Sequence, residues 1–313
     1  MNKKAFTLLE VLVATAVLSI MVVLLASIAG QVSKVWQDVS ANNQQRSAAR
    51  VLLQYMAREL QAVSNPVPMP ASSQTPANLQ MIASLPVNNS NATVIPPEDL
   101  NPHALFWQVS VAQDISQGNI ASVGYFIRWD TTSRPGHAKP ILCRFFVSPT
   151  DAANFKVYKQ SGAGAENWLS VLPTVAPATA PAYQGWMSDN VIALWIRFLD
   201  VDGSPITQNA AGQTMNSGYG FDSRQGYRSP TTAQIHPAPA YPPCVEISLV
   251  AVDSRTMEKI TSPLLPVTTT PADFDKGATT SGSIRYFVEN LPKEIKVGTR
   301  IFSTRVYLPA GGM

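Results

Sequence analysis

Residues 1–30 read MNKKAFTLLEVLVATAVLSIMVVLLASIAG, and this stretch decides how the chain is organised. Val11 to Gly30 is an uncharged run that, as a helix, extends about 30 Å, the thickness of the hydrocarbon core of a bilayer. Glu10 is the exception in the apolar segment, although a carboxylate at the bilayer centre costs roughly 2.5–3.5 kcal/mol. The stretch therefore predicts a membrane-spanning helix and raises the question of what Glu10 does in it.

A cleavable secretory signal peptide is the alternative reading of this stretch. Lys3 and Lys4 form a basic head, and Ser27-Ile28-Ala29 offers a small-x-small cleavage site. However, the apolar run is longer than the roughly 7–15 residues of a signal core, and it contains an acid. We therefore prefer a membrane span, and the two lysines predict a cytoplasmic N-terminus with the bulk of the chain exported.

Composition limits the remaining classes. The chain has 313 residues, of which 45% are hydrophobic and 14% charged, so it can bury a substantial core. Its formal net charge of +3 is spread along the chain, so nucleic acid is not an expected partner. The cysteines, Cys143 and Cys244, fit neither a zinc framework nor a CxxC pair, which leaves either one disulfide or two separate buried thiols.

The helix is predicted to continue beyond the membrane. There is no proline between Gln31 and Val63, and apolar residues return there at spacings of three and four, as on one face of a helix. Arg50, Arg58 and Glu59 lie off this stripe. We expect the stripe to pack as core against the rest of the protein; its members are Val32, Val35, Trp36, Val39, Ala48, Leu52, Tyr55, Met56, Leu60 and Val63.

Residues 64–104 are predicted to be a linker or long loop. They hold eight of the 25 prolines, and no helical or strand period emerges in them. Two later Pro-rich stretches, residues 172–183 and 229–243, are expected to be surface loops.

From Leu105 onward the sequence is typical of β-strands. Short β-rich runs bounded by Gly, Pro, Asp or Asn suggest an antiparallel sheet, and Ile301 to Leu308 alternates clearly between two faces. The segment 284–288 reads equally well as a strand or a short helix. The predicted strands cover residues 105–109, 122–129, 141–147, 191–199, 245–252 and 301–308.

The segment KKAFTLLEVLVA resembles the class III signal of type IV prepilins and type II secretion pseudopilins. The resemblance implies cleavage between Ala5 and Phe6 by prepilin peptidase, followed by N-methylation of Phe6. It also implies that Glu10, the fifth residue after the cut, balances the N-terminal amine of a neighbouring subunit during assembly. One departure is that Ala5 stands where the family prefers glycine.

The resemblance extends less specifically into the β-rich region. The runs VGYFIRWD, ILCRFF, ALWIRFLDVDG, PPCVEISLVAVD and FSTRVYLP are similar to the β-domain of J-type minor pseudopilins, and still more to the prepilin-like proteins called Verru_Chthon cassette protein C. The implied fold is α+β, with a long N-terminal helix packed on an antiparallel β-sheet domain. The organisation that we expect is a leader at 1–5, a transmembrane helix at 6–30, its amphipathic continuation at 31–63, a Pro-rich linker at 64–104 and a β-rich domain at 105–313.

Motifs for catalysis or cofactor binding are scarce. The histidines, His103, His137 and His236, lie near prolines or in polar loops, and none belongs to an HExxH motif. Asp200 and Asp202 begin like a calcium loop, but the later ligands are missing, and a DG hairpin turn after residue 199 explains them better. The sequence therefore indicates neither an enzyme nor a cofactor.

Two hypotheses remain. The first is a non-enzymatic minor pseudopilin of a type II secretion or type IV pilus-like assembly, located in the bacterial inner membrane with a periplasmic domain. Its implied partners are other pilins, prepilin peptidase and the inner-membrane assembly platform. The alternative is a membrane-anchored or secreted periplasmic enzyme or binding module whose site is not visible in the sequence.

Overall fold

The structure is a computed structural model. It describes residues 8–64, 79–83, 103–114, 118–131, 133–151, 155, 160–161, 164–165, 184–215, 220–267 and 273–309. The chain divides into two compact units, Met1–Ser47 and Ala48–Met313, and the long helix α1 contributes to both.

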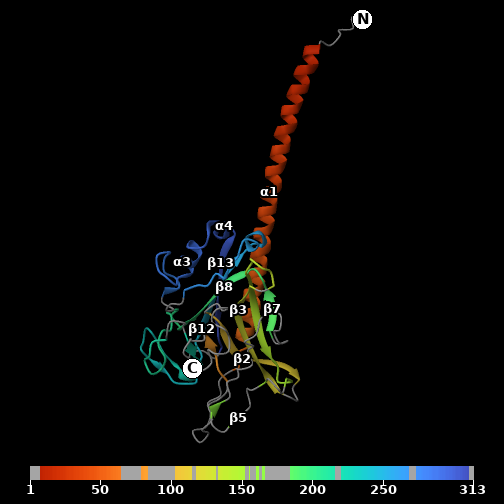
Figure 1. Cartoon of the computed structure of the whole chain (residues 1–313). Helices are drawn as coiled ribbons and strands as arrows, with labels where there is room; N and C mark the ends of the chain where they lie inside the picture. Colours follow the sequence, from red (N-terminus) through yellow and green to blue (C-terminus); the bar gives the residue numbers. More distant parts are fainter. Residues whose placement is uncertain are drawn as a thin grey trace. The chain divides into compact units, whose positions relative to one another are not determined.

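The elements follow one another as a long helix, a series of strands, and short helices before the final strand (Figure 1). In chain order they are α1 (Leu8–Gln61), β1 (Ile82–Ala83), β2 (Leu105–Asp114), β3 (Gly118–Asp130), β4 (Lys139–Val147), β5 (Gln160–Ser161), β6 (Gly164–Ala165), β7 (Gln184–Ser188), β8 (Val191–Leu199), β9 (Phe221–Asp222), the 3-10 helix η5 (Ser223–Gln225), β10 (Tyr227–Arg228), β11 (Ile235–His236), β12 (Cys244–Val252), α2 (Ser254–Met257), α3 (Ile284–Glu289), α4 (Lys293–Lys296) and β13 (Thr299–Tyr307).

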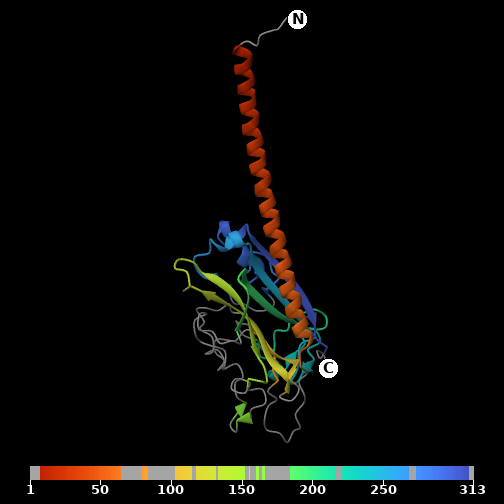
Figure 2. The same cartoon turned by 90° about the vertical axis from the view of Figure 1, so that its right-hand side faces the viewer.

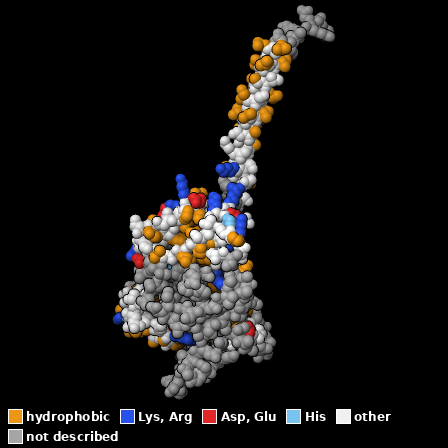
Figure 3. Space-filling view, in the orientation of Figure 1, with side chains coloured by type: hydrophobic (Ala, Val, Ile, Leu, Met, Phe, Trp, Pro, Cys, Tyr) orange, Lys and Arg blue, Asp and Glu red, His pale blue; other side chains and the backbone are white. Residues whose placement is uncertain are grey.

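In the first unit, α1 turns its apolar side chains outward. Its large hydrophobic residues from Leu8 to Val39 are between 49% and 84% exposed. Figure 3 shows such apolar side chains along the visible side of the helix. The segment Leu8–Gln37 is long and apolar enough to cross a membrane, by length and composition.

The predicted apolar stripe is buried in its second half only. Leu52, Met56, Leu60 and Val63 are core residues, as expected. The other members, Val32, Val35, Trp36, Val39, Ala48 and Tyr55, are exposed and do not pack as core in the structure. Spacing reveals an apolar face but not what covers it, and lipid or another subunit can cover such a face as well as a protein core can.

The second unit contains two main antiparallel sheets. The larger has the strand order β7-β4-β3-β2-β1-β9, and the smaller has the order β13-β12-β8. Two further pairs, β5-β6 and β10-β11, form two-stranded ribbons, and Arg228 of β10 also bridges to Gln208. In Figure 2 the end of α1 that belongs to this unit runs beside the strands.

The main core joins the end of α1 to both sheets. Leu53 and Met56 of α1 share it with Trp107 of β2, Ile196 of β8 and Ile247 of β12. Alternate residues of the strands point to the opposite faces, as the period of two requires. Phe106 and Phe126 therefore enter a second core on the far face of the larger sheet, and Trp195 enters a third core beneath α3.

The α+β fold class and all six predicted strands are confirmed. They correspond to β2, β3, β4, β8, β12 and β13, and along β13 residues 301, 303, 305 and 307 are exposed while Phe302, Thr304 and Val306 are more buried. The undecided segment 284–288 is a helix, α3, because the Ser283 side chain accepts a hydrogen bond from the backbone N–H of Tyr286 at 2.9 Å and so caps its start.

The Pro-rich segments are described only in part. Within 64–104, Met81 to Ala83 is buried, and β1 pairs with both β2 and β9. Within 229–243, the short strand β11 interrupts otherwise irregular backbone. Residues 172–183 lie outside the described residues. The domain boundaries stay predictions.

Candidate functional site

Glu10 lies in the first turn of α1 as described, and it is exposed there. Lys34 is the other charged residue between Leu8 and Gln37. The predicted processing residues, Ala5 and Phe6, lie outside the described residues, so cleavage and N-methylation stay predictions.

Two hydroxyl residues of the apolar segment form hydrogen bonds within the helix. The Thr15 hydroxyl donates to the carbonyl oxygen of Leu12 at 3.0 Å, and the Ser19 hydroxyl donates to the carbonyl oxygen of Thr15 at 2.8 Å. Such bonds to the preceding turn let hydroxyl groups lie in lipid at low cost. An ionised carboxylate cannot donate in this way, so Glu10 is chemically different from the hydroxyl residues of the same segment.

In the second unit, a cluster of charged and aromatic residues ties α1 to the larger sheet. Arg144 on β4 donates to Glu59 Oε1 from Nη2 at 2.5 Å and from Nε at 3.1 Å. Tyr125, which pairs with Arg144 across β3 and β4, donates its hydroxyl hydrogen to Glu59 Oε2. We call Glu59, Tyr125 and Arg144 the Glu59 cluster. The guanidinium carbon of Arg144 also lies 4.4 Å from the centre of the Phe146 ring.

The electrostatics of the Glu59 cluster follow from burial and pairing. Burial alone would lower the pKa of Arg144, but the hydrogen bonds and negative charge of Glu59 outweigh it and raise this pKa. Burial, followed by the charge and hydrogen bond of Glu59, raises the pKa of Tyr125, so its phenol stays protonated as a donor. Sequence reasoning placed Glu59 off the apolar stripe and did not identify this contact.

A second ion-pair ladder crosses the smaller sheet. Glu246 on β12 pairs in register with Arg197 on β8 and Arg305 on β13, and it accepts hydrogen bonds from both guanidinium groups. Arg197 also contacts Asp275. The ladder joins the strands of one sheet and presents no unpaired acid for chemistry.

The calcium-loop-like segment at Asp200 and Asp202 forms a turn. The backbone N–H of Gly203 donates to the carbonyl oxygen of Asp200 at 2.9 Å, and Gly203 has a φ of +83°, as the DG hairpin prediction requires. The carboxylate of Asp202 accepts from the backbone and hydroxyl of Ser204 and from the hydroxyl of Thr231. Within the described residues, no group of three or more His, Cys, Asp or Glu could hold a metal.

The histidines and cysteines are dispersed. His103 is buried against Trp195 and Phe274, and burial lowers its pKa to about 3. His236 stacks on Tyr227 in the β10-β11 ribbon, with ring centres 4.4 Å apart, and His137 lies in the loop between β3 and β4.

Both cysteines are free and buried in the structure. Cys143 belongs to the larger sheet and Cys244 to the smaller one. The structure thus has the second of the two predicted alternatives, separate thiols rather than a disulfide. Burial raises the pKa of both thiols.

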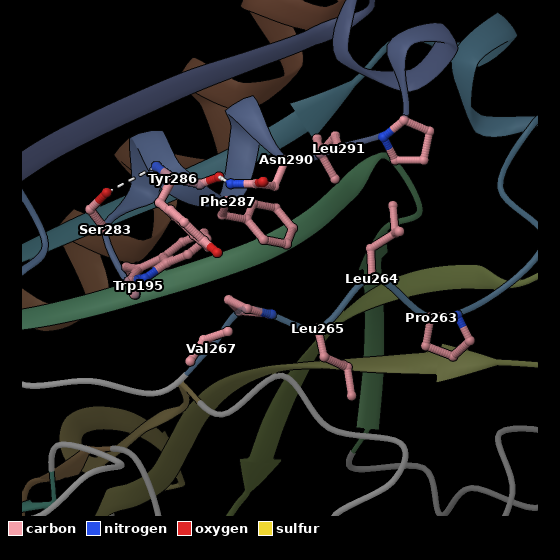
Figure 4. A pocket seen from close by; sticks show the side chains of 13 residues that line it. Trp195, Pro263, Leu264, Leu265, Val267, Ser283, Tyr286, Phe287, Asn290 and Leu291 are labelled. Carbon is pink, nitrogen blue, oxygen red and sulfur yellow. Dashed lines mark hydrogen bonds between the residues drawn. The ribbon is translucent and has the colours of Figure 1, made fainter. Parts of the chain in front are cut away.

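An apolar pocket of about 290 Å³ lies beside α3 (Figure 4). Tyr286 and Phe287 of α3 and Trp195 of β8 face the segment 263–267 across it. The Ser283 hydroxyl at its edge donates to the carbonyl oxygen of Gly277 and accepts from the Tyr286 backbone, so it is committed to capping the helix. Among the described residues that line this pocket there is no His, Asp, Glu, Cys, Lys or Arg, so these residues do not form a nucleophile paired with a base.

A second pocket, of about 310 Å³, is polar and lies between the β3–β4 loop and α2. Its charged residues are largely engaged with one another, since Arg134 pairs with Glu258 at 2.5 Å and Lys139 with Asp189 at 2.8 Å. His137 also lines this pocket, and its buried Nδ1 atom has no hydrogen-bond partner among the described residues. The pocket is therefore a surface depression whose charged side chains form ion pairs with one another.

Comparison with known proteins identifies the N-terminal segment. The family of the prokaryotic N-terminal methylation motif matches residues 1–26. No curated protein matches the chain. A solved type IV-like pilin from Thermus thermophilus is similar at 14% sequence identity and a TM-score of 0.34, over 86% of this chain and 98% of that one. By its motif, the chain has the N-terminal segment of a type IV prepilin-like protein.

Proposed function

We propose that the chain is a pilin-like structural subunit, and more specifically a minor pseudopilin of a type II secretion or type IV pilus-like assembly. In this proposal prepilin peptidase cuts between Ala5 and Phe6, and the new amine of Phe6 is methylated. The helix anchors the subunit in the inner membrane with its N-terminus in the cytoplasm and its β-rich unit in the periplasm. Other pilins and the inner-membrane assembly platform are the partners.

The observation that carries the proposal is the methylation motif at residues 1–26, which contains the proposed cut and Glu10. The apolar, outward-facing helix that follows it supports membrane anchoring. The bulky second unit supports a minor rather than a major subunit, because a large domain is awkward to repeat along a thin filament.

Glu10 is proposed to act in assembly. A charge that becomes buried on assembly must be paired or neutralised, so Glu10 requires a neighbouring subunit that offers an amine where the helices pack in apolar surroundings. The partner group in this proposal is the N-terminal amine of Phe6 on a neighbouring pilin.

Intact-mass measurement of the protein purified from its native membrane tests processing. We expect a chain that begins at methylated Phe6. A chain that retains Met1 would contradict cleavage, and a chain that begins near Gly30 would indicate a secretory signal peptide. As matched variants, Ala5→Leu should block the cut and Ala5→Gly should preserve it, because the peptidase must fit a small residue beside the scissile bond.

Crosslinking to partner pilins in the same membranes tests the role of Glu10. Glu10→Gln keeps the size of the side chain but deletes its charge, so we expect membrane insertion to persist while crosslinks to partners are lost. Thr15→Val is the control, because it also changes a polar residue of the segment, one already satisfied by Leu12. Equal crosslinking by wild type and Glu10→Gln would refute an assembly role.

A further inference from the structure

The apolar segment of α1 is longer than a bilayer's hydrocarbon core. Leu8–Gln37 has 30 residues, none of them buried in its most apolar window. At 1.5 Å per residue it extends about 45 Å, whereas the hydrocarbon core is about 30 Å thick and the bilayer with both headgroup layers about 40–45 Å. The segment therefore matches the whole bilayer, including the two headgroup layers.

The residues near the two ends of this segment differ from those between them. Glu10 lies near one end, and Lys34 and Trp36 lie near the other, with an uncharged run between. The Trp36 side chain is 71% exposed, so the structure leaves its indole ring available to the surroundings of the helix. Tryptophan concentrates in the headgroup layer because its ring is apolar while its N–H can donate, and lysine extends its ammonium group to the same layer.

Helix geometry decides how these residues can be placed. Glu10 and Trp36 are about 39 Å apart along the axis. At an average tilt of about 20° the separation across the bilayer is still about 37 Å, and it falls to about 30 Å only at the extreme of roughly 40°. At ordinary tilts, at least one of the two residues must therefore lie outside the hydrocarbon core.

We propose that Lys34 and Trp36 anchor the helix in the headgroup layer of the outer leaflet, and that this anchor holds Glu10 in the opposite headgroup layer before assembly. The partner is the lipid surface itself, with phosphate accepting from Lys34 and ester or phosphate oxygens accepting from the Trp36 indole. The inference rests on the membrane anchoring and orientation of the proposed function. It adds that the acid of an unassembled subunit lies among headgroups, near water, rather than at the bilayer centre.

Fluorescence quenching measures the depth of Trp36. The full chain is reconstituted in phosphatidylcholine vesicles whose acyl chains are brominated either near the headgroup or near the tail end. The signal of Trp36 is the difference between wild type and Trp36→Phe. We expect at least twofold stronger quenching by bromine near the headgroup; stronger quenching near the tail end, or none from either lipid, would overturn the proposal.

A shifted tryptophan calibrates the measurement. Val32 lies one helical turn nearer the bilayer centre and is 50% exposed. In the Trp36→Phe, Val32→Trp variant, the preference should move toward bromine nearer the tail end, by the roughly 6 Å that four residues span. An unchanged preference would mean that quenching does not report position along the helix, and would remove the support for an anchor at Trp36.

Thiol accessibility measures the other end of the segment. Leu9→Cys places a thiol beside Glu10, and Val22→Cys places one near mid-span; both positions are exposed on the helix. The native thiols are buried, so they provide a quiet background. A membrane-permeable maleimide should label the first variant at least tenfold faster, because reaction requires the hydrated thiolate; equal rates would overturn the placement of Glu10.

The anchor and the proposed function are tested by different experiments, so one can be refuted without the other. Carbonate extraction of the wild type tests membrane anchoring, and crosslinking tests assembly. Suppose that the chain resists carbonate extraction and its crosslinks depend on Glu10, but Trp36 is quenched most strongly by bromine near the tail end. That result would refute the anchor and leave the proposed function standing.

Discussion

Replacing Glu59 by glutamine deletes the charge that ties α1 to the larger sheet. The substitution keeps the length of the side chain, but its amide donates where the carboxylate accepted. If the amide nitrogen faces Arg144, a donor meets a donor; if it faces Tyr125, the phenol must turn from donor to acceptor. The second unit should lose stability because an arginine is left without its counter-ion.

The magnitude follows from how buried the pair is. Removing one partner of a buried ion pair costs about 3–5 kcal/mol. The Arg144 and Glu59 side chains retain 20% and 12% exposure, so water reaches part of the pair and reduces this penalty. We expect Glu59→Gln to lower the free energy of unfolding by about 2–3 kcal/mol.

Urea unfolding of the full chain in detergent, followed by near-ultraviolet circular dichroism, measures this loss. The signal is suitable because Trp107 and Tyr125 pack with ring centres 5.7 Å apart in the main core. Glu258→Gln is the matched control, since Glu258 also pairs with one arginine but is 65% exposed, and should show no measurable change.

A free energy of unfolding for Glu59→Gln equal to that of the control would refute a stabilising role for the Glu59 ion pair. A double-mutant cycle with Arg144→Met provides a second check. Its effects should be clearly non-additive, because both single changes remove the same interaction. Additive losses would mean that the two side chains contribute independently and that the pair is not the source of the stability.

Three other predictions concern the second unit. Cys143 and Cys244 should resist alkylation in the native protein, where burial raises the pKa of the first to about 12, and non-reducing mass measurement after unfolding should show two labelled thiols rather than a bridge. Gly124→Ala should destabilise the unit by about 1–3 kcal/mol, since an added Cβ would overlap the Phe106 ring; an unchanged melting temperature would count against this packing. Millimolar calcium should leave the melting temperature unaltered, because Asp202 is already hydrogen-bonded within its turn, and a rise reversed by a chelator would reveal a calcium site.

Much of the fold could be predicted from the sequence because its signals are local. The β-rich runs and the turn at Gly203 each depend on neighbouring residues, and the structure agrees with them. The exposed residues of the apolar stripe, such as Val32, show the limit of such signals. Periodicity identifies a face, but the element that covers it is chosen by the whole fold or by the membrane.

The residues of the candidate site also differ in whether the sequence could predict them. Ala5, Phe6 and Glu10 could be proposed because they belong to a continuous motif, and their roles stay predictions. The Glu59 cluster could not be identified, because Glu59 and Arg144 are 85 residues apart and a single sequence contains nothing that pairs them. The sequence shows only an acid one position before the buried Leu60. Such an acid is as common on a solvent-exposed helix face as in an ion pair with a sheet.

The main core also sets the order in which this protein can mature. Leu52 and Met56, made early in synthesis, are packed with Val306 and Leu308, which leave the ribosome much later. Contacts of such long range form slowly, and here they cannot begin until β13 has been made. A chain stalled before Thr299 would lack β13, so the edge of β12 that pairs with it would stay open to chaperones and proteases.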